Sequence, residues 1–342
     1  RRFSCPDLSM RRPTGFIAIY MRGIPNQVRG GLLAERLRGC VRFSECWSKG
    51  MGADSKPDPR LSPWRDDLAA SHLRGEVKAS KYVDGEPYCV SAPVTALRRS
   101  PADAAMMDTQ LLFGEGFRVY EKRGNWAWGQ SLTDDYVGYV LSGDLQPYYE
   151  TDHIVRVPRS FVYREPDIKS RPIMAISMGA RLHVTKKEGR FSYIEDGGQD
   201  EATGWIISTH ISSEGDYAED YVAIAEMFLH TPYLWGGRES LGLDCSALVQ
   251  LSLMQAGYAC QRDTYMQETT LGQEIKEGFE RGDLVFWKGH VGILQSSHQL
   301  LHANASFMQT VSEDFDNACQ RIEETDGPIT SIRRLSHSAI GV

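Results

Sequence analysis

The sequence of 342 residues contains no long hydrophobic run. Apolar stretches such as GFIAIYM at residues 15–21 are far shorter than the ~20 residues that a membrane-spanning helix needs. Paired cysteines are also missing, because no C-x-x-C motif occurs and His298 and His302 have no cysteine pair to complete a zinc site. We therefore expect no membrane span, no disulfide framework, no metal and no other cofactor.

Most of the chain also lacks a net positive charge. Residues 1–50 hold ten Lys or Arg against three acidic residues, a net charge of +7, whereas the whole chain carries −7, so residues 51–342 carry −14. Binding of nucleic acid needs a basic surface, so nucleic acid is not an expected partner. The hydrophobic share of 41% and the charged share of 24% are typical of a globular protein. Neither composition nor charge predicts the oligomeric state.

Residues 1–55 differ from the remainder in being rich in Arg and poor in acids. We expect a disordered tail, or an extension upstream of a true start at Met51; a transit peptide is the alternative. No basic segment leads into a sustained apolar stretch that ends in small residues, which is the pattern of a secretory signal. A cytoplasmic location is therefore expected. Residues 56–85 are expected to form a linker or a short helix.

Residues 86–148 and 149–213 both consist of short β-rich runs that Gly, Asn and Asp interrupt, as in small β-barrels. Gly114 matches Gly179, and Gly124 matches Gly189, at a spacing of about sixty-five residues. This repeat predicts a duplicated small barrel. Trp126, Trp128 and Trp205 are expected in the barrel cores, with an aromatic ligand groove as the alternative.

Residues 214–342 follow a different pattern, in which two helices precede antiparallel strands. Apolar residues at three- and four-residue intervals predict a helix in DYAEDYVAIAEMFLH, and CSALVQLSLMQAGY predicts a second helix with apolar residues along one side. GDLVFWKGHVGILQ reads as a hairpin that turns at Lys288 and Gly289. The fold class expected for this part is α+β.

Cys245 directly follows Asp244, a plausible N-cap, so it falls in the first turn of the second predicted helix. Free backbone N–H groups and the helix dipole favour a thiolate there, which is what a nucleophilic cysteine requires. His290 and His302 follow on successive predicted strands, in the order nucleophile, base and ring-orienting group. The alternatives are a buried structural cysteine and a core histidine at position 302.

Three blocks, PYLWGG…GLDCSALVQ, RGDLVFWKGHVGIL and LLHANA, together resemble the signature blocks of NlpC-type cysteine peptidases, which are papain-like enzymes that cut peptidoglycan stem peptides. The two upstream units resemble bacterial SH3 domains. The resemblance covers about residues 60–342 and implies a papain-like α+β peptidase domain preceded by two small SH3-like β-barrels. This order of domains is similar to that of the γ-D-glutamyl-L-diamino acid endopeptidases of the dipeptidyl-peptidase VI type.

The resemblance also implies roles for individual residues. Cys245 corresponds to the nucleophile, His290 to the general base and acid, and His302 to the residue that orients His290. The implied oxyanion and substrate-binding residues are Tyr233, Trp235, Asp244, Ser246 and Thr264 in the peptidase domain, and Glu115 with Tyr136 or Tyr139 in the first barrel. The barrel residues are expected to bind the free amine of an N-terminal L-Ala.

The function that the resemblance implies is hydrolysis of the γ-D-glutamyl–diamino acid bond in peptidoglycan-derived peptides, L-Ala-γ-D-Glu-diamino acid, during cell-wall recycling. Two alternatives stay open. One is an SH3-type protein that binds cell-wall material or peptides and carries an inactive peptidase domain, and the other is a thiol acyltransferase on the same fold. The sequence does not distinguish diaminopimelate from Lys at the diamino acid position.

Overall fold

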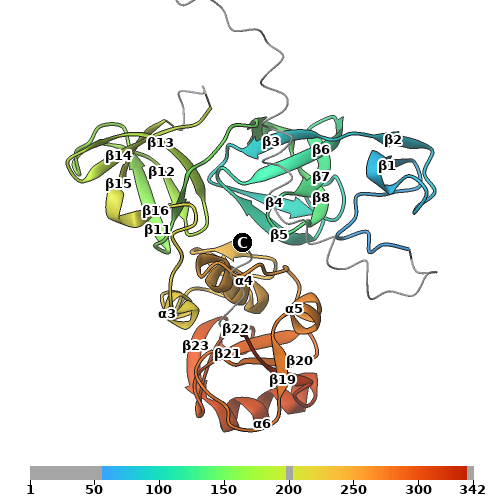
Figure 1. The fold of residues 1–342 in the computed structure, drawn as a ribbon, viewed down its shortest axis with the longest axis vertical. Coiled ribbons are helices and arrows are strands. Elements are labelled where there is room, and N and C mark those ends of the chain that lie inside the picture. The colour runs from blue at the N-terminus through green and yellow to red at the C-terminus, as the bar shows by residue number, and fades with distance from the viewer. Residues whose placement is uncertain (1–55, 198–202, 337–342) are drawn as a thin grey trace, which may run out of the picture. The chain divides into compact units, whose positions relative to one another are not determined.

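The computed structural model describes residues 56–197 and 203–336 (Figure 1). The tail or extension predicted at residues 1–55 lies outside the described residues. The segment predicted to be a linker or short helix instead contains two strands that pair in parallel, β1 (Leu68–Ala70) and β2 (Lys81–Val83), and a 3-10 turn at Ser71–Leu73. Among the described residues, no helix has both the length and the apolar character needed to cross a membrane.

The first β domain is a seven-stranded sheet with the order β5-β4-β8-β7-β6-β3-β9 (Figure 1). Alternate residues of β4 are buried, which places Leu97 in a core with Val90, Phe117 and Val140. Trp128 is also buried. The strands are β3 (Glu86–Val90), β4 (Val94–Arg98), β5 (Met107–Leu112), β6 (Gly116–Arg123), β7 (Trp126–Ser131), β8 (Val137–Leu141) and β9 (Leu145–Pro147).

The second β domain has the strand order β12-β11-β15-β14-β13-β10-β16. Trp205 is buried and its ring packs against Tyr193, with ring centroids 4.9 Å apart. The strands are β10 (His153–Val155), β11 (Arg159–Tyr163), β12 (Pro172–Ser177), β13 (Arg181–Glu188), β14 (Phe191–Glu195), β15 (Gly204–Ile207) and β16 (Ile211–Ser213).

The two β domains share one topology. Matching β3 with β10 and continuing strand by strand to β9 and β16 gives the same order in both sheets. The glycines that revealed the repeat adopt the left-handed backbone conformation in matching turns, with φ of 74° and 91° at Gly114 and Gly179, and 59° and 57° at Gly124 and Gly189. A side chain at these positions would strain the turn. The predicted duplication is confirmed.

The third domain combines helices with a six-stranded antiparallel sheet of order β19-β24-β20-β21-β22-β23. The predicted hairpin joins β20 and β21 through Lys288 and Gly289, and Trp287 pairs with His290 across it. The elements are α3 (Tyr221–Glu226), β17 (Arg238–Glu239), β18 (Gly242–Leu243), α4 (Cys245–Gln255), α5 (Thr264–Thr270), β19 (Gln273–Ile275), β20 (Leu284–Trp287), β21 (His290–Ser296), β22 (Gln299–Asn304), β23 (Gln309–Asp314), α6 (Phe315–Asp326) and β24 (Ser331–Arg334).

Helix α4 lies at the centre of this domain and is buried on nearly every side, Met254 being its one residue that is not buried. The prediction of a single buried side was therefore wrong. The reason is tertiary, because α4 packs on β21 and β22 and also meets both β domains. Gln250 donates to the Asp134 carboxylate at 3.0 Å, and Gln255 donates to the Val155 carbonyl at 3.1 Å. These bonds tie the middle and the last residue of α4 to the two β domains.

Candidate active site

Cys245 is the first residue of α4, and its side chain is 6% exposed. Asp244 caps the helix, since its carboxylate accepts a hydrogen bond from the Ala247 N–H at 2.9 Å. The thiol lies 3.9 Å from Thr264 Oγ1, and the backbone N–H of Val291 donates to the sulfur. Because Val291 follows His290, the thiol lies at the start of β21, the strand that His290 begins.

Asp244 and Ser246 are held by Arg262, a fully buried arginine. The Arg262 guanidinium donates to both oxygens of Asp244, at 2.9 and 2.7 Å, and to Ser246 Oγ at 2.7 Å. Its Nε donates to Thr109 of the first β domain at 2.7 Å. The expectation that Asp244 and Ser246 bind substrate is corrected here, because their polar groups are already bonded inside the protein. They fix the position of Cys245 instead.

The environment of the thiol acts against a thiolate. Burial raises the pKa of Cys245 to about 11, and the nearby Asp244 carboxylate adds to this effect. The expectation that the start of the helix lowers the thiol pKa was therefore wrong. Burial also lowers the pKa of His290 to about 3, with further contributions from His302 and Arg321. At neutral pH the resting pair is a thiol and a neutral imidazole.

The rings of His290 and His302 form a T-shaped pair, with their planes at 62° to one another and their centroids 5.0 Å apart. His290 Nε2 and His302 Nδ1 are 2.8 Å apart, a hydrogen bond whose donor depends on the tautomer. The Trp287 ring packs 5.7 Å from the His290 ring. His302 is fully buried, and its Nε2 lies 2.6 Å from Glu313 Oε1 on β23. The sequence reasoning did not identify Glu313, because its proximity depends on how β22 and β23 pair.

Tyr233 lies beside the thiol. Burial raises its pKa, and charge on Cys245 and then Asp244 contributes to the rise. The backbone N–H of Tyr233 donates a hydrogen bond to the Met308 carbonyl at 2.9 Å, which holds this segment in place. Trp235, two residues further along, is 64% exposed. The oxyanion role for Tyr233 and the cleft-wall role for Trp235 stay predictions.

Glu115 does not face open space. It is 1% exposed, and Arg238 Nη1 donates to its two oxygens at 2.9 and 2.7 Å. The Leu112 N–H and the Thr133 hydroxyl donate to the same carboxylate. Arg238 also bonds Gln250 of α4 at 2.7 Å. The expectation that Glu115 binds a substrate amine is therefore corrected, since a buried carboxylate already paired with arginine has no free position for another cation.

Tyr136 lies closer to the thiol than the sequence could show. Its hydroxyl donates to Asp263 Oδ2 at 3.2 Å, and Asp263 immediately precedes Thr264, which contacts the sulfur. Arg60 also reaches Asp263 Oδ2, at 3.2 Å. Burial raises the pKa of Tyr136, and the charges of Asp263 and Asp108 raise it further. Asp263 was visible in RDTYMQ but was passed over, whereas Asp108 and Arg60 come from distant segments.

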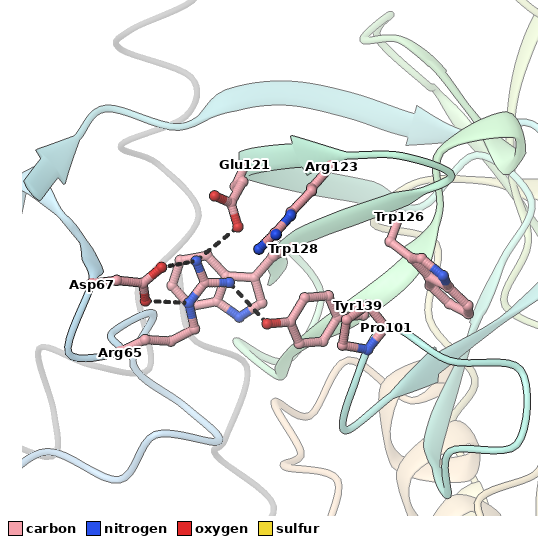
Figure 2. A pocket seen from close by; sticks show the side chains of 8 residues that line it. All are labelled: Arg65, Asp67, Pro101, Glu121, Arg123, Trp126, Trp128 and Tyr139. Carbon is pink, nitrogen blue, oxygen red and sulfur yellow. Dashed lines mark hydrogen bonds and ion pairs between the residues drawn. The ribbon is translucent and has the colours of Figure 1, made fainter.

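Tyr139 is in a different place, on the outer side of the first β domain. Figure 2 shows the Arg65 guanidinium over the Trp128 ring, 4.3 Å from its centre, and bonded to Asp67, Glu121 and Tyr139. These side chains line a hollow of about 450 Å³ that Pro101, Arg123 and Trp126 complete. Tyr139 shares this hollow with Trp126 and Trp128. Trp128 is buried, as expected, whereas Trp126 is only half-buried, so the expectation that Trp126 lies in the barrel core was wrong. Its proposed contact with a substrate amine is corrected, because its hydroxyl already accepts from Arg65.

Metal chemistry has no candidate centre in residues 56–197 and 203–336. Within these ranges, no three or more His, Cys, Asp or Glu side chains gather in a way that could hold a metal ion. The four cysteines in the part of the chain that the structure describes, Cys89, Cys245, Cys260 and Cys319, are free thiols. Of these, Cys245 is the one bonded to the start of β21, the strand that begins with His290. The site thus combines a buried thiol at the start of β21 with an imidazole, on the first residue of that strand, whose ring is held by a second imidazole. A thiol and an imidazole are the groups that acyl transfer through sulfur requires.

Comparisons with known proteins agree with this geometry. Residues 230–322 match the NlpC/P60 family model, and residues 97–145 match the model of the bacterial dipeptidyl-peptidase SH3 domain. The chain is 25% identical over 242 residues to dipeptidyl-peptidase 6 of Lysinibacillus sphaericus, covering 63% of this chain and 86% of that protein. It is 25% identical over 217 residues to the gamma-D-glutamyl-L-lysine dipeptidyl-peptidase of Bacillus subtilis, covering 58% and 72%.

A solved structure supports the fold. The crystal structure of an NlpC/P60 family protein from Bacillus cereus aligns with a TM-score of 0.63 at 19% identity, over 73% of this chain and 99% of that one. At this identity the likeness concerns the fold, which consists of two N-terminal β domains and an α+β peptidase domain. The chain carries an NlpC/P60 cysteine peptidase domain, and a bacterial SH3 domain of the dipeptidyl-peptidase type lies on its N-terminal side.

Proposed function

We propose that this protein hydrolyses the γ-D-glutamyl–diamino acid bond of short peptidoglycan peptides, L-Ala-γ-D-Glu-diamino acid, and that it serves cell-wall recycling. The observation that carries the proposal is a buried thiol held at the start of β21, the strand whose first residue, His290, is bonded to His302. The relatives that bear the name gamma-D-glutamyl-L-lysine dipeptidyl-peptidase support the choice of bond.

The proposed reaction begins from the neutral pair. As the Cys245 sulfur attacks the γ-carbonyl of D-Glu, its proton moves to His290, so that charge separation is confined to the reacting complex. The protonated His290 then gives this proton to the departing amine of the diamino acid, and the C–N bond breaks. Water, deprotonated by His290, resolves the thioester and regenerates the thiol. The backbone N–H of Cys245 and the Tyr233 hydroxyl are the proposed donors to the oxyanion.

A free N-terminal amine is the second part of the proposal. Asp263 supplies a carboxylate next to Thr264, and Tyr136 adds a hydroxyl to the same group. Burial raises the pKa of Asp263, against the effect of Arg262 and Arg60. An ammonium group that binds here would form a charge-assisted hydrogen bond in a largely dehydrated position. Peptides whose L-Ala is blocked would lose this bond, and the enzyme would therefore select free peptides.

The experiment that tests this function measures products by mass spectrometry. The substrates are L-Ala-γ-D-Glu-L-Lys, L-Ala-γ-D-Glu-diaminopimelate and the N-acetylated form of each. The proposal predicts that only the free peptides yield L-Ala-D-Glu and the free diamino acid. Replacing Asp263 by Asn should reduce kcat/KM for the free peptides by about 10-fold or more and leave the acetylated peptides uncut.

Other outcomes of the same experiment would reject the proposal. Equal cleavage of free and acetylated peptides would reject selection through the amine. Peptide binding without cleavage would favour an SH3-type binding protein with an inactive peptidase domain. Transfer of L-Ala-D-Glu to an added amine in preference to water would favour a thiol acyltransferase.

A further inference from the structure

The row of bonded groups that starts at the thiol continues beyond His302. Glu313 Oε1 lies 2.6 Å from His302 Nε2, and Arg321 of α6 forms an ion pair with the same oxygen. Arg321 is itself held, since its Nη1 donates to Ser306 Oγ at 3.0 Å. The Glu313 side chain is 17% exposed, so water competes only weakly for its carboxylate. Three elements, β22, β23 and α6, thus converge on one ring nitrogen of His302.

The carboxylate of Glu313 remains ionised in this setting. Burial acts to raise its pKa, but the hydrogen bond and charge of His302 and the charge of Arg321 lower it below its usual value. Burial, the largest effect on His302, lowers the pKa of that ring and favours its neutral form, although Glu313 opposes this. An ionised carboxylate can only accept a hydrogen bond, so the neutral His302 must carry its proton on Nε2.

The position of this proton on His302 determines the tautomer of the His290 ring. With Nε2 protonated, His302 Nδ1 is bare and accepts from His290 Nε2–H across the 2.8 Å contact. A neutral His290 with its proton on Nε2 has a bare Nδ1, which is the atom that can accept the Cys245 proton. The opposite tautomer of His302 would place the His290 proton on Nδ1. In that state His290 could not act as the base.

Asn304 competes with Glu313 for His302 Nε2, and the two side chains favour opposite tautomers of His302. Its side-chain amide lies 3.0 Å from the same His302 Nε2, and its Oδ1 accepts from the Phe307 N–H at 2.9 Å. With its oxygen engaged, Asn304 offers an N–H to Nε2, which suits the opposite tautomer of His302. Glu313 is closer and charged, and a charge-assisted hydrogen bond is roughly twice as strong as a neutral one. Glu313 therefore prevails over Asn304.

The geometry points to Glu313, held by Arg321, as a positioning residue that fixes the tautomers of His302 and His290 so that His290 presents a free Nδ1 to the Cys245 thiol. This inference rests on the proposed cysteine peptidase reaction. Glu313 touches neither the thiol nor a substrate and acts through His302. The charged and titratable groups that face it are His302 on β22 and Arg321 on α6, with His290 of β21 one ring further.

The first test is spectroscopic and needs no substrate. In protein labelled with ¹⁵N-histidine, nitrogen chemical shifts at neutral pH report which ring nitrogen is protonated, and His290→Gln and His302→Gln variants assign the signals. We expect the Nε2–H tautomer for both rings in the wild type. Glu313→Gln should move His302 to the Nδ1–H tautomer, because a glutamine amide can donate to Nε2. A wild-type His302 protonated on Nδ1 would overturn the inference, even if no Glu313 variant folds.

The second test measures kcat and KM. Glu313→Gln should lower kcat by roughly 10²–10⁴-fold with little change in KM, because an imidazole in the wrong tautomer is a lost base and substrate binding is untouched. Arg321→Lys keeps the ion pair and should stay within about threefold of wild type. Glu324→Gln removes the same charge from an exposed position on α6 and serves as the matched control.

The two readouts must change together. A fall in kcat without a tautomer change, or a tautomer change without a fall in kcat, would overturn the role assigned to Glu313. If the wild type cuts none of the peptides, the proposed substrate is wrong, while the nitrogen shifts still decide the tautomers. The rate of Cys245 alkylation in each variant then replaces kcat as the measure of thiol activation.

Discussion

Replacing Glu115 by Ala is expected to destabilise the protein strongly. Glu115 and Arg238 are buried together, with side chains 1% and 2% exposed, and Glu115 Oε2 lies 2.7 Å from Arg238 Nη1. Removing one partner leaves an arginine charge without its counter-ion in the interior, at a cost of ~3–5 kcal/mol in the free energy of unfolding. For a chain of this size that cost lowers the melting temperature by roughly 6–20 °C. The pair also joins the first β domain to α4, so local separation should accompany the loss.

Thermal unfolding followed by circular dichroism or calorimetry measures this effect, and peptide cleavage at a low temperature measures activity in the same samples. The matched double variant Glu115→Leu with Arg238→Met removes both charges, and we expect it to recover most of the lost stability. If Glu115→Ala instead shifts the melting temperature by less than about 2 °C while raising KM for free peptides, then Glu115 faces the substrate. That result would refute the structural assignment.

Three further predictions concern the site itself. Because burial raises the pKa of Cys245 to about 11, only about one molecule in 10⁴ is a thiolate at pH 7. Iodoacetamide should therefore alkylate Cys245 slowly at pH 7, and the rate should rise about tenfold per pH unit up to that pKa. Fast alkylation that is independent of pH near neutrality would show a stable thiolate. Since the pKa of His290 is lowered to about 3, kcat/KM should show no loss near the ordinary histidine pKa as the pH falls, and a half-maximal rate near pH 6.5 would contradict this. Replacing Arg60 by Ala should lower KM for free peptides about two- to fivefold, because it removes a partly exposed cation that competes with the substrate ammonium for Asp263. Lys78→Ala is the surface control. An unchanged KM in the Arg60 variant would show that Arg60 does not compete.

Local sequence signals predicted much of the fold. The glycines at 114, 124, 179 and 189 revealed the repeat because only a residue without a side chain adopts the backbone that these turns need. Lys288 and Gly289 likewise predicted the hairpin that positions His290. The burial of α4 on nearly all sides was not predictable, since it depends on contacts from both β domains that lie far away in the sequence.

Local sequence signals predicted part of the candidate site, as they predicted part of the fold. Cys245, His290 and His302 come together because each sits at a recognisable point of a local element. Glu115 was misjudged because its partner, Arg238, is 123 residues away, and sequence alone does not show that a carboxylate is buried. Glu313 was missed for a similar reason, since an acidic residue on a strand is ordinarily exposed and only the pairing of β22 with β23 reveals its contact.

The measurement that tests the central claim most directly is the initial rate of L-Ala-γ-D-Glu-diamino acid cleavage by the wild type, Cys245→Ala and Cys319→Ala. Cys319 is a half-buried free thiol on α6 and serves as the control for loss of a sulfur. The account predicts that Cys245→Ala loses about 10⁶-fold in kcat while Cys319→Ala keeps its rate. Turnover by folded Cys245→Ala at a rate near that of the wild type would contradict it.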